Sequence, residues 1–160
     1  MDFINNIEDK YPKELLENRL AIEGCVIGCI YKDILCLDEI QLEQDYFITT
    51  DGRFYYLLAQ HLRQKNFNTL DEVTIVSNVP EKSQKQYYEK GGFETIQNFV
   101  DIISINNLEG YVESLYRENM LLNLYNKGFN LLNEIEYEGK TIQPLKEFRK
   151  LTTEQIVDFY

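Results

Sequence analysis

Residues 108–135 restrict the possible folds of this chain more than any other segment, because their large apolar side chains recur at helical intervals. Seven-residue intervals separate Leu115, Leu122 and Phe129, and likewise Tyr125 and Leu132. A second apolar stripe runs beside the first and consists of Leu121, Leu124, Leu131 and Ile135. The spacing predicts one helix over 108–135, and so wide an apolar arc is typical of a helix with two packing partners. One partner is the body of its own domain, and the other is a second arm or another subunit.

The first stripe therefore predicts an assembly surface, made of Leu115, Leu122, Tyr125, Phe129 and Leu132. In a monomer we expect the first four of these side chains to remain partly in water. Burying each of them between two copies would contribute ~1.5–3 kcal/mol, against an association cost of ~4–15 kcal/mol. A dimer of modest affinity is expected. The alternative is that the whole stripe packs on the rest of its own domain, within one chain.

Helical spacing continues through the rest of the chain, and only three prolines and eight glycines interrupt its 160 residues. This composition argues against a turn-rich β architecture, so the sequence predicts an all-α fold. Pro12 suits the first turn of a helix, and Thr50 or Asp51, Thr69 or Asp71, and Thr152 or Thr153 are candidate helix caps. Gly91 and Gly92 are expected to end the helix over 80–88. The expected helices cover about residues 12–31, 33–40, 53–62, 72–79, 80–88, 93–103, 108–135, 142–151 and 154–160.

Three local patterns add detail to this picture. Residues 73–76 are all β-branched, so a strand is the alternative to a helix there. Residues 134–140 are polar and are expected to form a connector. Gly24 and Gly28 form a GxxxG pattern, which indicates close packing of a soluble helix because charged residues flank it.

The charge of the chain argues against one class of function. There are 27 acidic and 16 basic residues, which gives a net charge of −11. Since DNA-binding surfaces depend on Lys and Arg contacts to phosphate, we expect little or no direct DNA binding, and protein partners instead. No signal segment is visible, and no apolar run approaches the ~20 residues of a membrane span. A cytoplasmic protein is expected.

Catalytic and metal-binding patterns are missing from the sequence. The chain lacks the phosphate-binding G-x-x-x-x-G-K-[ST] loop and the G-x-S-x-G, H-E-x-x-H and C-x-x-C motifs. Its single histidine, His61, lies between leucines on the flank of a predicted helix, where a structural role is expected. Cys25, Cys29 and Cys36 lie in apolar surroundings, which predicts buried free thiols rather than disulfides or a zinc site. We therefore expect no catalytic site, metal or cofactor in these 160 residues.

Five short segments carry a resemblance to a known family. They are 23–33 (EGCVIGCIYKD, with Gly28), 45–47 (DYF, with Asp45), 71–75 (DEVTI, with Asp71 and Thr74), 91–92 (Gly91 and Gly92) and 111–122 (YVESLYRENMLL). In this order they resemble the patterns E-x-A-V-L-G-x-x-x-x-D, D-F-Y, D-x-V-T-V, G-G and Y-Y-A-x-I-V-x-E-K-x-L-L-R of DnaB-type replicative DNA helicases. The matches keep near-family spacing and cover about residues 17–135.

The resemblance implies the non-catalytic N-terminal domain of such a helicase. It implies a helical head over 1–105, a helical hairpin over 106–151, and over 152–160 the start of a linker helix to a RecA-like ATPase domain. Hairpins of this family pair into a collar on a hexameric ring, where primase and helicase loaders dock. ATP and magnesium would belong to the motor domain. The final aromatic pair, Phe159 and Tyr160, fits this interpretation, because a natural chain rarely stops on two aromatics.

The chain also departs from the family pattern. The histidine of the family's D-F-Y…H-x-x-I-F segment is Asp51 here, and its basic pair after Leu-Leu is Asn123 and Leu124. The second arm is short and interrupted by Pro144, which resembles divergent phage-type members. Two alternatives are open: the helicase-binding C-terminal domain of a primase, and a stand-alone phage protein that binds and modulates a replicative helicase.

Overall fold

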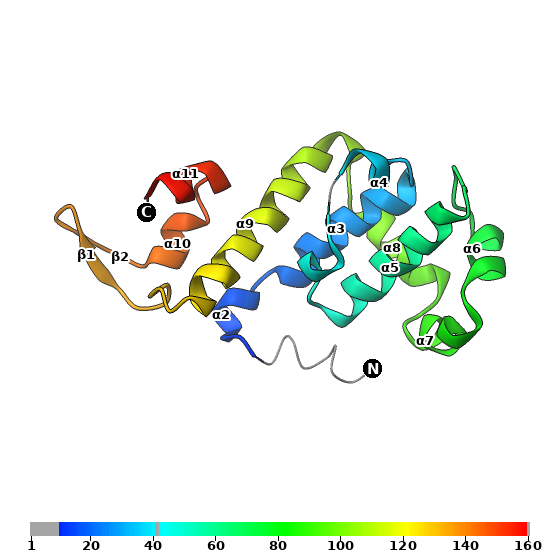
Figure 1. The fold of residues 1–160 in the computed structure, drawn as a ribbon, viewed down its shortest axis with the longest axis horizontal. Helices are drawn as coiled ribbons and strands as arrows, with labels where there is room; N and C mark the ends of the chain where they lie inside the picture. Colours follow the sequence, from blue (N-terminus) through cyan, green and yellow to red (C-terminus); the bar gives the residue numbers. More distant parts are fainter. Residues whose placement is uncertain (1–9, 41, 160) are drawn as a thin grey trace.

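A computed structural model describes residues 10–40 and 42–159 and confirms the predicted all-α fold, with 66% of these residues helical and one small two-stranded sheet among them. The elements are α2 (Lys13–Leu16), α3 (Arg19–Lys32), α4 (Cys36–Glu39), η1 (Gln44–Tyr46), α5 (Thr50–Gln64), α6 (Glu72–Asn78), η2 (Glu81–Ser83), α7 (Gln84–Glu89), α8 (Phe93–Asp101), η3 (Ile105–Asn107), α9 (Leu108–Asn126), β1 (Ile135–Tyr137), β2 (Lys140–Ile142), α10 (Pro144–Phe148) and α11 (Thr153–Phe159). Figure 1 shows an elongated molecule, with α6 and α7 at one end and the β1–β2 hairpin at the other.

Helix α3 lies at the centre of the head, where α5, α8 and α9 pack against it. Its GxxxG pattern faces α8. A Cβ on Gly28 would clash with the backbone carbonyl oxygen of Phe99, and a Cβ on Gly24 would lie 3.0 Å from the Phe99 ring. The predicted close packing of a helix is confirmed, and here it occurs within one chain.

Two apolar clusters fill the interior, and α9 contributes to both. The N-terminal half of α9 places Val112 and Leu115 in the larger cluster around α3 and α5. Its C-terminal half places Leu121 and Leu122 in a second cluster, together with Leu15, Ile48, Leu131, Leu145, Phe148 and Ile156. The last of these lies on α11, which packs back on α9.

The prediction of one helix over 108–135 is wrong beyond residue 126. Gly128 has φ 92°, a left-handed conformation that favours glycine. The Phe129 N–H donates to the Leu124 carbonyl at 3.1 Å, and the Gly128 N–H donates to the Tyr125 carbonyl at 3.0 Å. These two bonds form a Schellman motif, which satisfies the last carbonyls of the helix and ends it.

The segment predicted as a polar connector contains a β-hairpin instead. Ile135 pairs with Ile142, and Tyr137 with Lys140. The turn residues Glu138 and Gly139 have φ values of 51° and 78°. Two successive positive φ angles match a type I′ turn, whose twist suits a two-residue hairpin.

Other helix boundaries also differ from the prediction. The expected helix over 12–31 is broken at Asn18, which adopts φ 62° between α2 and α3. Residues 33–40 form only the short helix α4. Helix α5 is capped by Thr49, whose side chain accepts from the Gly52 N–H, and not by Thr50 or Asp51.

Several predicted boundaries are confirmed. Residues 73–76 are helical, and Asp71 caps α6 by accepting from the Thr74 N–H at 2.7 Å. Gly91 and Gly92 both have positive φ and end α7 before α8 begins. Thr152 caps α11, accepting from the Gln155 N–H at 3.2 Å.

The tight contact at Gly28 generates a stability prediction. Gly28→Ala is expected to lower the free energy of unfolding by ~1–3 kcal/mol, because the new methyl group meets backbone rather than a movable side chain. Gly110→Ala is the matched control, since nothing lies within 4 Å of a Cβ there and Gly110 is within α9. It should raise stability by ~0.4–1 kcal/mol. Urea unfolding followed by circular dichroism measures both, and equal effects of the two changes would contradict the packing described.

Candidate docking groove

A groove with a volume of about 940 Å³ lies between α5 and the η2–α7 segment. Its apolar side is formed by Phe54, Leu57 and Leu58 of α5, with Pro80 opposite. This volume is at the upper end of the ~300–1,000 Å³ of ligand sites. Leu57 is 37% exposed, so the groove offers apolar surface to a binding partner.

The charge of the groove is opposite to that of the chain. Four basic side chains line it, against the single carboxylate of Glu89: Arg53, Lys82, Lys85 and Lys90. The lining therefore carries a net +3, while the whole chain carries −11 and the remainder −14. His61, the only histidine of the chain, also lines the groove. A basic site on so acidic a molecule is the part of its surface that attracts an anionic partner, while the surrounding acidic surface repels one.

The two walls of the groove are tied together at one end. The Lys90 ammonium pairs with Asp51 of α5 at 2.8 Å and lies 5.7 Å from the centroid of the Phe54 ring. The Thr95 hydroxyl donates to the Lys90 carbonyl and fixes the backbone of the turn after α7. Asp51 stands where the resembled family has its histidine, and here it anchors this wall.

The start of α5 is set by a buried carboxylate from α3. Both Glu23 oxygens are buried: they accept from the Ile48 N–H at 2.9 Å and from the Thr49 N–H at 3.2 Å. The Thr49 hydroxyl also donates to Glu23 while accepting from the Gly52 N–H, so the cap of α5 is held by α3. The α5 wall of the groove therefore takes its position from Glu23.

The countercharge of Glu23 is Arg19, one turn earlier on the same helix. Its Nε lies 2.6 Å from Glu23, and its Nη2 donates to Asn119 of α9 at 2.7 Å and to the Tyr46 carbonyl. Arg19 is 2% exposed and Glu23 is fully buried. Burial raises the pKa of the Glu23 carboxyl, and the Arg19 cation and the Thr49 and Ile48 donors oppose that rise.

A second charged contact holds the C-terminal elements to α9. The Glu118 carboxylate is 3% exposed and pairs with Arg149 at 2.9 Å. Arg149 also donates to the Glu14 carbonyl at 3.0 Å, so α2, α9 and the end of α10 meet at one guanidinium. Sequence reasoning missed both networks, because charged residues on amphipathic helices look like solvent-facing positions.

The residues of the predicted assembly surface are separated by the fold. Leu115 is fully buried and Leu122 is 4% exposed, both in the chain's own clusters, so the expectation that they remain in water in a monomer is wrong. Tyr125 and Leu132 are half-buried against the second cluster, and the Tyr125 ring contacts that of Tyr11. Phe129, 39% exposed, is the member of this set that lies most in solvent.

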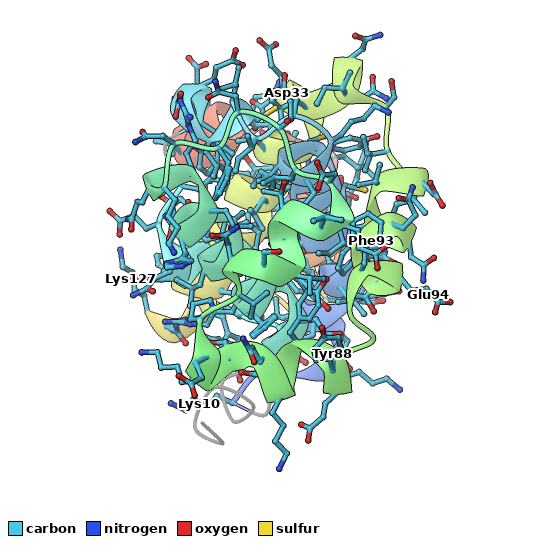
Figure 2. All side chains as sticks on the ribbon, turned by 90° about the vertical axis from the view of Figure 1, so that its right-hand side faces the viewer. Lys10, Asp33, Tyr88, Phe93, Glu94 and Lys127 are labelled. Carbon is cyan, nitrogen blue, oxygen red and sulfur yellow. The ribbon has the colours of Figure 1, made fainter. Side chains whose placement is uncertain are left out.

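Most residues of the family-like motifs have roles in helix packing, helix capping or turns. Gly28 contacts α8, Asp71 and Thr74 form the cap of α6, and Gly91 and Gly92 make the turn before α8. Asp45 is exposed in η1. Figure 2, which views the end formed by α6 and α7, shows Tyr88 and Phe93 on the same flank, on either side of the glycine turn.

The three cysteines are free thiols. Burial raises the pKa of Cys29 and of Cys36 to about 11 and also raises that of Cys25. Within residues 10–40 and 42–159, no group of three or more His, Cys, Asp and Glu side chains has the arrangement of a metal site.

No protein-family model, no curated protein and no solved structure matches this chain. No helix in the described part of the chain has the length and apolarity needed to cross a bilayer.

The buried pair predicts an asymmetric response to mutation. Arg19→Met is expected to lower the free energy of unfolding by ~3–5 kcal/mol, because it leaves the Glu23 carboxylate buried without a cation. Lys85→Met removes a cation from an exposed i,i+4 pair with Glu89 and should change stability little. Urea titrations at neutral pH compare the unfolding midpoints of the two variants. Similar midpoints for the two variants would show that the buried Glu23 carboxylate does not depend on Arg19 as its countercharge.

The raised thiol pKa values predict slow alkylation. In the native protein at pH 8, a thiol with a pKa of about 11 is ionised in roughly one molecule in a thousand. Iodoacetamide should therefore modify Cys29 and Cys36 far more slowly than the same residues in urea, and half-buried Cys25 should react first. Peptide mass spectrometry over a pH series measures the rates. A native rate that levels off near pH 9 would contradict the assigned environment.

Proposed function

We propose that this chain is a non-catalytic scaffold domain of the kind found at the N-terminus of DnaB-type replicative helicases. In this role it mediates oligomer assembly and docks primase or a helicase loader during DNA replication in the cytoplasm. ATP and magnesium would be used by a motor domain and not by these residues. Direct DNA binding would be weak.

The observation that carries the proposal is that the five family-like segments pack together in the folded chain. Ile27, Phe47, Ile75 and Leu115 come from four of these segments and belong to the same apolar cluster. The fifth segment, the glycine pair, starts α8, which packs on the GxxxG face of α3. The resemblance implies that these segments belong to one domain, and their packing around one apolar cluster agrees with that.

The basic groove adds support for a docking role. It presents apolar surface rimmed by cations on a molecule whose remaining surface is strongly acidic. Such a combination suits recognition of another protein, because charge complementarity selects the partner and apolar contact holds it.

Assembly is tested through Phe129. We expect sedimentation equilibrium to show a monomer–dimer equilibrium of modest affinity, since Phe129 is exposed beside the half-buried Tyr125 and Leu132. Phe129→Glu should shift this equilibrium to monomer without loss of helicity. Val73→Glu is the matched control, because Val73 is 75% exposed on α6 at the other end of the molecule. A mass that stays monomeric at all concentrations, or equal effects of both changes, would overturn the assembly role.

The identity of the partner separates the alternatives. A helicase-type domain is expected to bind a replicative primase, whereas a primase-type domain or a phage modulator would bind the intact helicase hexamer. Surface plasmon resonance with primase or the helicase hexamer immobilised on the chip measures which of the two the chain binds. The reading frame after the codon for Tyr160 is an independent discriminator: a P-loop there supports the helicase and a stop codon supports the modulator.

A further inference from the structure

We propose that the groove between α5 and α7 binds an acidic, amphipathic helical segment of a partner protein. The inference rests on the docking role proposed above and specifies the chemistry of the ligand. Its occupant would place one or two large apolar side chains against Leu57 and Phe54 and its carboxylates beside Lys82 and Lys85.

The charges of the groove favour carboxylates over other ligands. Lys90 is already paired with Asp51 at 2.8 Å and braces the α5 wall. Lys85 contacts Glu89 only at 3.8 Å, with side chains that are 89% and 63% exposed, so this pair is weak and its cation is accessible. Lys82 is exposed as well, and Arg53 faces the groove from α5. Three cations thus remain to meet an anionic partner from both walls.

The apolar side of the groove favours a peptide over an inorganic anion. Phe54, Leu57 and Leu58 lie on one face of α5, and Pro80 covers the opposite wall. A free phosphate would leave this surface in water, whereas an amphipathic helix covers it with its own apolar residues. The volume of about 940 Å³ accommodates a few side chains and not only a small ion.

Nucleic acid fits the site less well. Strong binding of a nucleic acid requires many phosphate contacts along a continuous basic surface. Here the basic lining is confined to one groove, and the rest of the chain carries −14. A long polyanion would meet that acidic surface on either side, whereas a short acidic helix would not.

The test uses the full chain and a designed probe. The probe is a helical peptide of about 15 residues with Leu and Phe at i, i+3, i+4 and i+7, Glu and Asp on the other face, and a neutral fluorophore. Fluorescence anisotropy is expected to give saturable binding with a Kd on the order of 1–100 µM. The affinity should weaken with added salt, because the rim charges are exposed.

Charge reversal locates the binding. Lys82→Glu with Lys85→Glu should weaken the probe at least about tenfold. The double change Lys127→Glu with Lys146→Glu alters net charge equally at exposed positions outside the groove and should leave the affinity within about twofold. Leu57→Gln tests the apolar contact and should weaken binding by about threefold to tenfold. Circular dichroism checks that each variant keeps its helicity.

Four outcomes would overturn the proposal: no saturation up to about 1 mM probe, equal effects of the two charge reversals, tighter binding of a Lys-substituted probe, or tighter binding of oligothymidylate than of the acidic peptide. The last result would assign the groove to nucleic acid. The peptide experiment tests the groove, whereas the sedimentation experiment tests the surface around Phe129. Failure of the peptide experiment therefore does not contradict the scaffold role, and failure of the sedimentation experiment does not contradict peptide binding in the groove.

Discussion

The arrangement of the head depends on one buried carboxylate, that of Glu23. It satisfies two backbone N–H groups of the segment before α5 and the hydroxyl that caps this helix. Its countercharge, Arg19, reaches α9 through Asn119. Three parts of the chain that are far apart in sequence, namely α3, the segment that leads into α5, and α9, are thus held by a single side-chain pair. A buried pair of this kind is costly to form and more costly to break, so it defines one arrangement of α3, α5 and α9 rather than adding stability for its own sake.

The proposed contact surfaces lie in different parts of the molecule. The groove is beside α7, and Phe129 lies between α9 and the β-hairpin (Figure 1). Assembly through the hairpin end would leave the groove open to a partner. A scaffold that joins copies of itself while recruiting another protein needs this separation, because one contact must not occlude the other.

Much of the fold follows from the sequence, since helical periodicity and capping residues are local signals. Asp71, Thr152 and the glycine pair Gly91 and Gly92 mark helix ends that the structure confirms. Gly128 also signals the end of α9 in the sequence. The apolar repeat continues beyond this glycine, however, and it led to the prediction of a longer helix. The groove was not predictable, because α5 and α7 meet only in the folded chain. Arg19 and Glu23 were missed for another reason: an i,i+4 ion pair has the same pattern on a helix surface as inside a core.

Two neighbouring residues of α9 face different parts of the chain. Asn119 joins the Arg19 network of the head, and Glu118 holds Arg149 at the end of α10. A turn of α9 about its axis, or a slip along it, would strain both contacts at once. A movement of α9 is therefore coupled to both the head and the C-terminal elements, and the chain should lose its structure in a single cooperative step, as one folding unit rather than two.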